Sequence, residues 1–289
     1  GSVDHRYLPL DAINSYLAKV KKPFCLFVTS DYPHGPYPKD GDYTKNDIYS
    51  LPYSGSNVPN YKPGYYQNIK SDNTQLEAVL EMVDSHNLRD NSIFIYASDH
   101  GISGKWGVSE QGLKIPFVVR WPGVVAPGTT SQILLGLVDV LPTFLEITSS
   151  KIDKNIDGKS FYKTLQGDES AVNDYIFSLA TRQNIQACKV FPTRAVRGKR
   201  YKFIRNYNAL EVYTSNLGKN SVINSFIKLG AESFPKIPYE ELYDLENDPY
   251  QKNNLIKNSK FDIVKSQLSQ VLHTWMESQD DFLILNKMP

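Results

Sequence analysis

The chain has 289 residues, of which 40% are hydrophobic, and its formal net charge is +1 because 32 Lys and Arg oppose 31 Asp and Glu. This balance gives no reason to expect nucleic acid or an anionic membrane surface as a partner. No apolar run reaches the ~18 residues that a membrane span needs, so we expect no transmembrane helix.

Cysteine usage and the start of the chain carry little functional information. Cys25 and Cys188 form no Cys-x-x-Cys pair, so the sequence predicts neither a zinc knuckle nor a redox motif. Cys25 lies in an apolar run, where we expect a buried thiol. The chain begins with Gly1-Ser2 and no Met, which is typical of a cloning remnant, so targeting cannot be predicted from this terminus.

The first third of the chain predicts a β-α-β unit. Apolar spacing predicts a helix over residues 10–20, and the continuous apolar run Phe24–Ser30 is typical of a parallel strand covered on both faces. Residues 31–70 show neither period and are rich in Tyr and Pro, so we expect a structured loop over a cleft. A helix over residues 71–86 and a strand over residues 92–98 complete the unit.

Two further elements are predicted before the composition changes. The stretch "IPFVVRWPG", residues 115–123, predicts a strand closed by a turn. Residues 133–147 predict a helix, and we expect Pro142 to kink it because proline removes one helical hydrogen bond.

From about residue 170 the pattern becomes antiparallel. Short alternating stretches with turn residues between them predict an antiparallel sheet, and an amphipathic helix is expected over residues 260–278. We therefore predict an α/β fold in which residues 1–168 belong to a large mixed or parallel-sheet domain. Residues 169–289 would form a small antiparallel-sheet subdomain with a terminal helix.

Polar side chains follow two of the predicted strands, at the edge where ligands bind in open α/β sheets. Asp31 and His34 follow the first strand, and Asp99 and His100 follow the second. An ionised Asp at the end of a buried strand is costly unless it is paired or metal-bound, although Asp also favours plain turns. Lys105 could pair with Asp99 or bind a substrate anion.

Several short motifs occur in one order along the chain. They are Asp99-His100-Gly101, Gly104-Lys105, "EQGLKIP" and "RWPG", with "SDYPHGPY" upstream and "YEELYDLENDPYQKNNL" downstream. Together they resemble the C-terminal portion of type I, formylglycine-dependent sulfatases over roughly residues 20 to 280. The similarity is greatest to the heparan N-sulfatase-like branch and to bacterial polysaccharide sulfatases.

The resemblance implies an alkaline-phosphatase-like fold and a role for each matched residue. Asp99 and His100 would be two ligands of a Ca²⁺ ion. His34 would bind the sulfate and protonate the leaving oxygen, a task that suits an imidazole near neutral pH. Lys105 would hold a sulfate oxygen and offset charge as the S–O bond breaks. The substrate would be a sulfated oligosaccharide or polysaccharide, and the protein would be periplasmic or secreted.

Several parts of the family pattern have no match in this chain, among them a Gly-Lys-Trp-His segment. The Cys/Ser-x-Pro/Ala-x-Arg segment that yields the formylglycine nucleophile is missing, and so is an early Asp-Asp pair that completes the metal site. We therefore expect a truncated sulfatase that is inactive alone. It would hold Ca²⁺ weakly, because that ion takes ~6–8 oxygen ligands. Exposed sheet edges would make homodimerisation plausible.

Two arginines are candidates for substrate contact. Arg194 and Arg197 lie on a predicted strand, where we expect them to face one side and Arg194 to contact a polyanionic glycan. The alternative is structural pairing with carboxylates. Glu110 is expected to support its local turn.

Two other functions remain open from the sequence. One is a metal-dependent phosphoesterase of the alkaline-phosphatase superfamily, although five histidines are few for its two-metal site. The other is a non-catalytic glycan-binding pseudoenzyme whose Tyr-rich loop forms the binding surface.

Overall fold

The computed structural model describes residues 6–47, 63–101, 107–181, 192–207 and 237–285. The chain divides into two compact units, which are described separately. The first unit comprises Gly1–Pro52, Val58–Ile95 and Val119–Ala126. The second unit comprises Tyr53–Asn57, Tyr96–Val118 and Pro127–Pro289. The predicted boundary at residue 168 stays a prediction.

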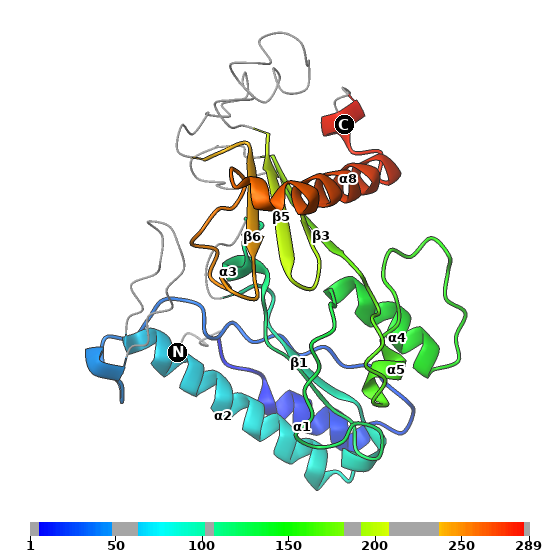
Figure 1. Cartoon of the computed structure of the whole chain (residues 1–289). Coiled ribbons are helices and arrows are strands. Elements are labelled where there is room, and N and C mark those ends of the chain that lie inside the picture. The colour runs from blue at the N-terminus through cyan, green and yellow to red at the C-terminus, as the bar shows by residue number, and fades with distance from the viewer. Residues whose placement is uncertain (1–5, 48–62, 102–106, 182–191, 208–236, 286–289) are drawn as a thin grey trace. The chain divides into compact units, whose positions relative to one another are not determined.

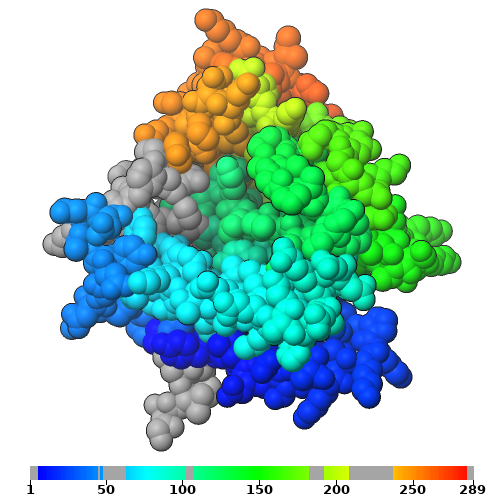
Figure 2. Space-filling model, turned by 90° about the horizontal axis from the view of Figure 1, so that it is seen from below, coloured from blue at the N-terminus to red at the C-terminus, as the bar shows by residue number. Residues whose placement is uncertain are grey.

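Two helices build the core of the first unit. Helix α1 (Leu10–Lys19) confirms the predicted helix, and α2 (Pro63–Ser85) begins inside the stretch predicted as loop. Side chains four residues apart share one face of each helix, and the two apolar faces pack together. The buried members are Ile13, Leu17, Val79 and Val83. Figure 1 shows α1 running beside α2, and Figure 2 shows N-terminal atoms in dark blue along one side of α2 in cyan.

The predicted strand Phe24–Ser30 is not formed. These residues carry no strand assignment, and residues 24 to 28 are exposed, including Cys25. The predictions of a buried strand and a buried thiol were therefore wrong for this chain. A strand needs a hydrogen-bonded neighbour, and in the described part of the chain none pairs with this segment.

Short elements follow α2. The 3-10 helix η2 (Arg89–Asn91) leads into β1 (Phe94–Ala97), and β1 pairs with β2 (Phe117–Arg120) in a two-stranded sheet. Both strands confirm the sequence prediction. In the described part of the predicted loop that precedes α2, the structure assigns one short 3-10 helix, η1 (Lys45–Asp47).

The helix predicted over residues 133–147 is shorter than expected. It consists of η3 (Leu137–Asp139) and α4 (Val140–Ile147), and α5 (Tyr162–Leu165) follows. The predicted kink at Pro142 is not needed, because this proline is the third residue of α4. The first N–H groups of a helix have no intrahelical acceptor, so proline costs nothing there.

A four-stranded antiparallel sheet forms the centre of the second unit, as predicted. Its strands, in spatial and sequence order, are β3 (Ile176–Ala180), β4 (Thr193–Arg197), β5 (Tyr201–Asn206) and β6 (Glu240–Asp244). The register aligns one apolar row across all four strands: Phe177, Val196, Phe203 and Leu242.

Helix α8 (Asp262–Ser278) packs against this apolar row, and Figure 1 shows the helix lying across the strands of the sheet. Leu268, Leu272 and Met276 recur at four-residue intervals and are fully or almost fully buried against the sheet. Trp275 stacks on Phe177 with ring centroids 4.7 Å apart. The 3-10 helix η4 (Ser259–Phe261) precedes α8, and α9 (Phe282–Leu285) follows it. None of the helices in the described ranges is both long and apolar enough to cross a bilayer.

Asp244, at the end of β6, predicts a pH-dependent contribution to stability. Hydrogen bonds from Arg200, at 2.7 and 3.0 Å, and from Asn247 hold the Asp244 carboxylate and lower its pKa to about 2. A depressed folded-state pKa means that this stabilisation is present above about pH 4 and is lost between about pH 4 and pH 2. Because Arg200 is partly exposed, we expect the pair to contribute about 1 kcal/mol to the free energy of unfolding.

The measurement is the free energy of unfolding at a series of pH values, for the wild type and for Asp244→Asn. Asp244→Asn should make the free energy of unfolding depend less on pH in the acid range. Asp90→Asn, at an exposed position, should leave that pH dependence unchanged. Equal acid slopes for the wild type and Asp244→Asn would contradict the assignment.

Candidate functional site

The turn after β1 presents two candidate ligands side by side. The Asp99 side chain is 81% exposed, and its Oδ1 lies 3.8 Å from His100 Nε2. His100 Nδ1 lies 2.6 Å from the Gly101 carbonyl oxygen, so Nδ1–H donates to it and Nε2 is the ring nitrogen left for another partner. The turn therefore presents an exposed carboxylate and an imidazole nitrogen, the donor types that a cation site uses.

Gly101 lets this turn approach the short helix α3 (Glu110–Leu113). Its N–H donates to the Gly112 carbonyl oxygen at 2.8 Å. A Cβ at position 101 would lie 2.3 Å from the Gln111 carbonyl oxygen and 2.8 Å from that of Lys114. Such distances exclude any side chain, so glycine is required for the close approach of the two backbones.

Helix α3 is in turn tied to the antiparallel sheet through Glu110. The buried Glu110 carboxylate accepts from Lys202 Nζ at 2.8 Å and lies 3.1 Å from Arg197 Nη1. The Glu110 N–H donates to Gln251 Oε1 at 2.6 Å. Burial lowers the pKa of Lys202, and Glu110 opposes that shift. These contacts extend the expected supporting role of Glu110 to a buried ion-pair cluster.

Sequence reasoning did not find Lys202. Its strand reads "YKFIRN", in which a lysine is typical of a solvent-facing position. The pairing register supplies the missing signal, because Lys202 lies opposite Arg197 and next to Phe203, which faces α8. Neighbouring strand residues point to opposite faces, so Lys202 points to the face where Glu110 lies.

His34 lies in the first unit, on an exposed loop that α2 holds in place. Asn68 of α2 is buried and donates to the His34 carbonyl oxygen at 2.8 Å. The His34 ring places Nδ1 2.8 Å from the Gly35 carbonyl oxygen, so Nδ1–H donates and Nε2 is left for chemistry. Ser30 and Asp72, at 2.7 Å, fix the chain just before this loop.

The predicted site is therefore only partly described. Asp99 and His100 are brought together, Lys105 lies outside the described residues, and His34 belongs to the other unit. Within the described ranges, no three His, Cys, Asp or Glu side chains are placed to hold a metal ion. The convergence of His34, Lys105 and the Asp99–His100 turn stays a prediction.

Arg194 does not occupy the position expected of a substrate contact. Its side chain is 3% exposed, and its Nε and Nη2 donate to Asp281 at 2.5 and 3.2 Å. Arg197 pairs instead with Glu110. The expectation that both arginines face one side was wrong, because residues three apart on a strand point to opposite faces. Arg194 is thus a buried ion-pair partner, as the structural alternative predicted.

Comparisons with known proteins define the class. The sulfatase family profile matches residues 8–150, and the profile of the N-sulphoglucosamine sulphohydrolase C-terminal region matches residues 98–217. A Bacteroides thetaiotaomicron sulfatase solved in work on glycosaminoglycan metabolism superposes with a TM-score of 0.69 at 21% identity. That superposition covers 97% of this chain and 61% of the other. The fold is therefore the alkaline-phosphatase-like fold of sulfatases.

Two further relatives are a curated sulfatase and a sulfatase-like structure solved with a bound sugar. An ulvan-active sulfatase of Formosa agariphila is 46% identical over 290 residues, which are 98% of this chain and 58% of the relative. A structure solved in complex with D-glucosamine-2-N,6-O-disulfate superposes with a TM-score of 0.60 at 18% identity, covering 78% of this chain and 42% of the other. The chain belongs to the sulfatase family. It spans 58% of the length of that ulvan-active sulfatase.

Proposed function

We propose that these residues form the C-terminal portion of a sulfatase that hydrolyses sulfate groups of a sulfated polysaccharide. The observation that carries the proposal is the 46% identity to an ulvan-active sulfatase along nearly the whole chain. A sulfated sugar, D-glucosamine-2-N,6-O-disulfate, is also the ligand named for a structural relative. Ulvan is accordingly the first substrate to test.

The chain's own residues suit the leaving-group side of the reaction. Hydrolysis breaks the bond between sulfur and the bridging oxygen, and the departing alkoxide needs a proton. His34 is exposed and its Nδ1–H donates to the Gly35 carbonyl oxygen, so the doubly protonated ring would supply that proton from Nε2 and be left neutral. Lys105 would place its ammonium on a sulfate oxygen and offset the developing negative charge. The nucleophile, formylglycine in this family, would come from the part of a complete sulfatase outside these residues.

The turn after β1 fits a calcium site, because it is accessible to solvent and carries side chains that can bind a cation. Asp99 offers a carboxylate free of described hydrogen bonds, and His100 offers the Nε2 lone pair. A bound Ca²⁺ would supply positive charge that stabilises the sulfate. Two donors are only part of the ~6–8 that calcium takes, so we expect strong binding only in a complete protein.

The test is release of inorganic sulfate from ulvan by a completed chain. This chain joins the 289 residues to the part of the Formosa agariphila sulfatase that they do not align with. We expect multiple turnovers from the completed chain and none from the 289 residues alone. Phosphate release from phosphate monoesters without sulfate release would favour the phosphoesterase. Retention on ulvan without hydrolysis would favour the pseudoenzyme, and either result would overturn the proposal.

A further inference from the structure

A cluster of tyrosines lies in the first unit, next to the His34 loop. The tyrosine cluster consists of Tyr37, Tyr43, Tyr65 and Tyr66, whose neighbouring rings have centroids 5.7 to 6.0 Å apart. Tyr37 is 42% exposed, whereas the other three are half-buried. Burial raises the pKa of the Tyr65 hydroxyl, and the neighbouring Tyr37 and Tyr66 add to that shift. The cluster therefore presents the Tyr37 ring to solvent on a base of half-buried rings.

Close packing at two glycines fixes the position of Tyr37. At Gly64, in the first turn of α2, a Cβ would lie 2.1 Å from the Pro38 carbonyl oxygen and 3.0 Å from Tyr37 Cβ, so glycine is required there. At Gly35, a Cβ would lie 3.7 Å from atoms of the Tyr37 ring, so the ring packs against the backbone. The edge-to-face contact with Tyr65 sets the orientation of the ring. A ring held in this way loses little conformational freedom when a ligand binds to it.

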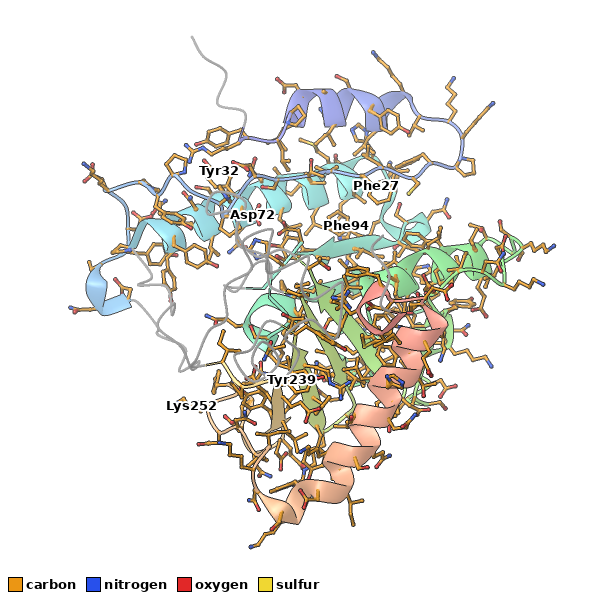
Figure 3. The ribbon with its side chains drawn as sticks, turned by 90° about the horizontal axis from the view of Figure 1, so that it is seen from above. Phe27, Tyr32, Asp72, Phe94, Tyr239 and Lys252 are labelled. Carbon is orange, nitrogen blue, oxygen red and sulfur yellow. The ribbon has the colours of Figure 1, made fainter. Side chains whose placement is uncertain are left out.

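The loop that carries Tyr37 also carries His34, three residues earlier. Asn68 of α2 is 2% exposed, and its side-chain amide donates to the His34 carbonyl oxygen at 2.8 Å. Figure 3 shows Tyr32, two residues before His34, on the ribbon that runs along α2, close to Asp72 of that helix. The imidazole and the exposed ring therefore belong to one loop that α2 holds in place. Cα atoms three residues apart lie at most about 11 Å apart, so a chain of one or two sugars reaches from the ring to the imidazole.

The chemistry around Tyr37 indicates the class of ligand. A tyrosine ring has apolar faces and a hydroxyl, so it suits a sugar, whose C–H groups pack on an aromatic face while its hydroxyls form hydrogen bonds. Residues 39 to 42, "KDGD", are all exposed beside the ring. They hold one lysine and two aspartates, and Lys70 of α2 pairs with Asp42, so positive and negative charges balance there. An apolar polypeptide segment would bury these charges and does not fit.

We propose that the Tyr37 ring is the stacking platform for a sugar ring of the sulfated polysaccharide, with the rest of the tyrosine cluster as its support. The inference rests on the proposed function for the identity of the substrate, which the 46% identity to an ulvan-active sulfatase supports. It goes further because it assigns a residue that binds the sugar and not the sulfate. Tyr37 would therefore favour sulfate groups on a glycan chain over sulfate groups on a small ester.

The test compares Tyr37→Ala with the wild type in the completed chain, with ulvan oligosaccharides as substrate and inorganic sulfate as inhibitor. Tyr37→Ala should raise KM for the oligosaccharides about ten-fold and leave kcat within about two-fold, as expected when uniform binding is lost. The inhibition constant of inorganic sulfate should stay unchanged, because a sulfate ion at His34 needs no contact with the ring. An unchanged KM would overturn the proposal and indicate that polypeptide covers the ring. Equal weakening of sulfate binding would also overturn it, because Tyr37 would then act through the His34 loop.

Tyr16 of α1 provides the matched control, because it is also 42% exposed and also makes an edge-to-face ring contact in the first unit. Tyr16→Ala should leave both constants unchanged. Tyr37→Trp keeps an aromatic face and should keep KM within about three-fold of the wild type. Tyr37→Leu keeps apolar bulk without a ring and should raise KM as Tyr37→Ala does. A wild-type KM for Tyr37→Leu would overturn the proposal even if Tyr37→Ala failed to fold.

Titration calorimetry with the same oligosaccharides separates this proposal from the proposed function. If the completed chain releases no sulfate but binds the oligosaccharides about ten-fold more weakly after Tyr37→Ala, the platform stands and the sulfatase proposal fails. Sulfate release with the same KM for Tyr37→Ala and Tyr16→Ala would overturn the platform alone. A completed chain that neither binds nor cleaves the oligosaccharides would overturn both.

Discussion

Replacing Lys202 with Met is expected to lower the free energy of unfolding of the chain by about 3 kcal/mol. The Lys202 side chain is 1% exposed, and its ammonium contacts Glu110, which is itself buried. Removing the lysine leaves a buried carboxylate with Arg197 as its remaining charged partner. Taking one partner from a buried ion pair costs more than the pair contributes, because the remaining charge stays out of water. Urea denaturation followed by circular dichroism measures the change.

A lysine close in sequence provides the matched control. Lys199 is exposed in the turn between β4 and β5, so Lys199→Met should change stability by less than about 0.5 kcal/mol. The double variant Lys202→Met with Glu110→Met removes both charges and should recover much of the loss. If Lys202→Met is as stable as Lys199→Met, the cluster does not hold α3 on the sheet.

Replacing His34 with Ala in the completed chain is expected to lower kcat on ulvan about 100- to 10,000-fold, the range for loss of a general acid. The exposed ring keeps Nε2 free because Nδ1 donates to the Gly35 carbonyl oxygen. The effect should be much smaller on an aryl sulfate with an acidic phenol, because that leaving group departs without a proton. Initial rates of sulfate release on both substrates give the comparison.

The control for His34 is a histidine of the second unit. His273 lies on α8, 3.3 Å from Glu277, and His273→Ala should leave both rates unchanged. An equal loss for His34→Ala on ulvan and on the aryl sulfate would contradict a proton-donor role. It would instead indicate that His34 binds the sulfate without protonating the leaving oxygen.

The periodicity of apolar residues predicted most helices and strands, because other described residues cover the apolar faces of these elements. α1, the antiparallel sheet and α8 bury the faces that their periodicity predicts, whereas β1 and β2 form as predicted but are only partly buried. The exception is the segment Phe24–Ser30, whose sequence is typical of a covered strand. No strand among the described residues pairs with this segment, so its apolar side chains stay exposed in this structure.

The site was predictable where sequence neighbours carry the chemistry, and not where the fold brings distant residues together. Asp99, His100 and Gly101 are adjacent, and Gly101 is needed because α3 lies against its backbone. Lys202 and Glu110 are far apart in sequence and meet only through the register of the sheet. The prediction that Arg194 contacts substrate missed its ion pair with Asp281. The alternation of a strand does not show which distant acidic residue will pack against it.

The most direct measurement is a crystal structure of the completed chain with a sulfated oligosaccharide and calcium. The account predicts one sulfate group within hydrogen-bond distance of both His34 Nε2 and Lys105 Nζ. Asp99 and His100 should bind the neighbouring calcium ion. A sulfated sugar bound with His34 and Lys105 on separate surfaces, away from the Asp99–His100 turn, would contradict it.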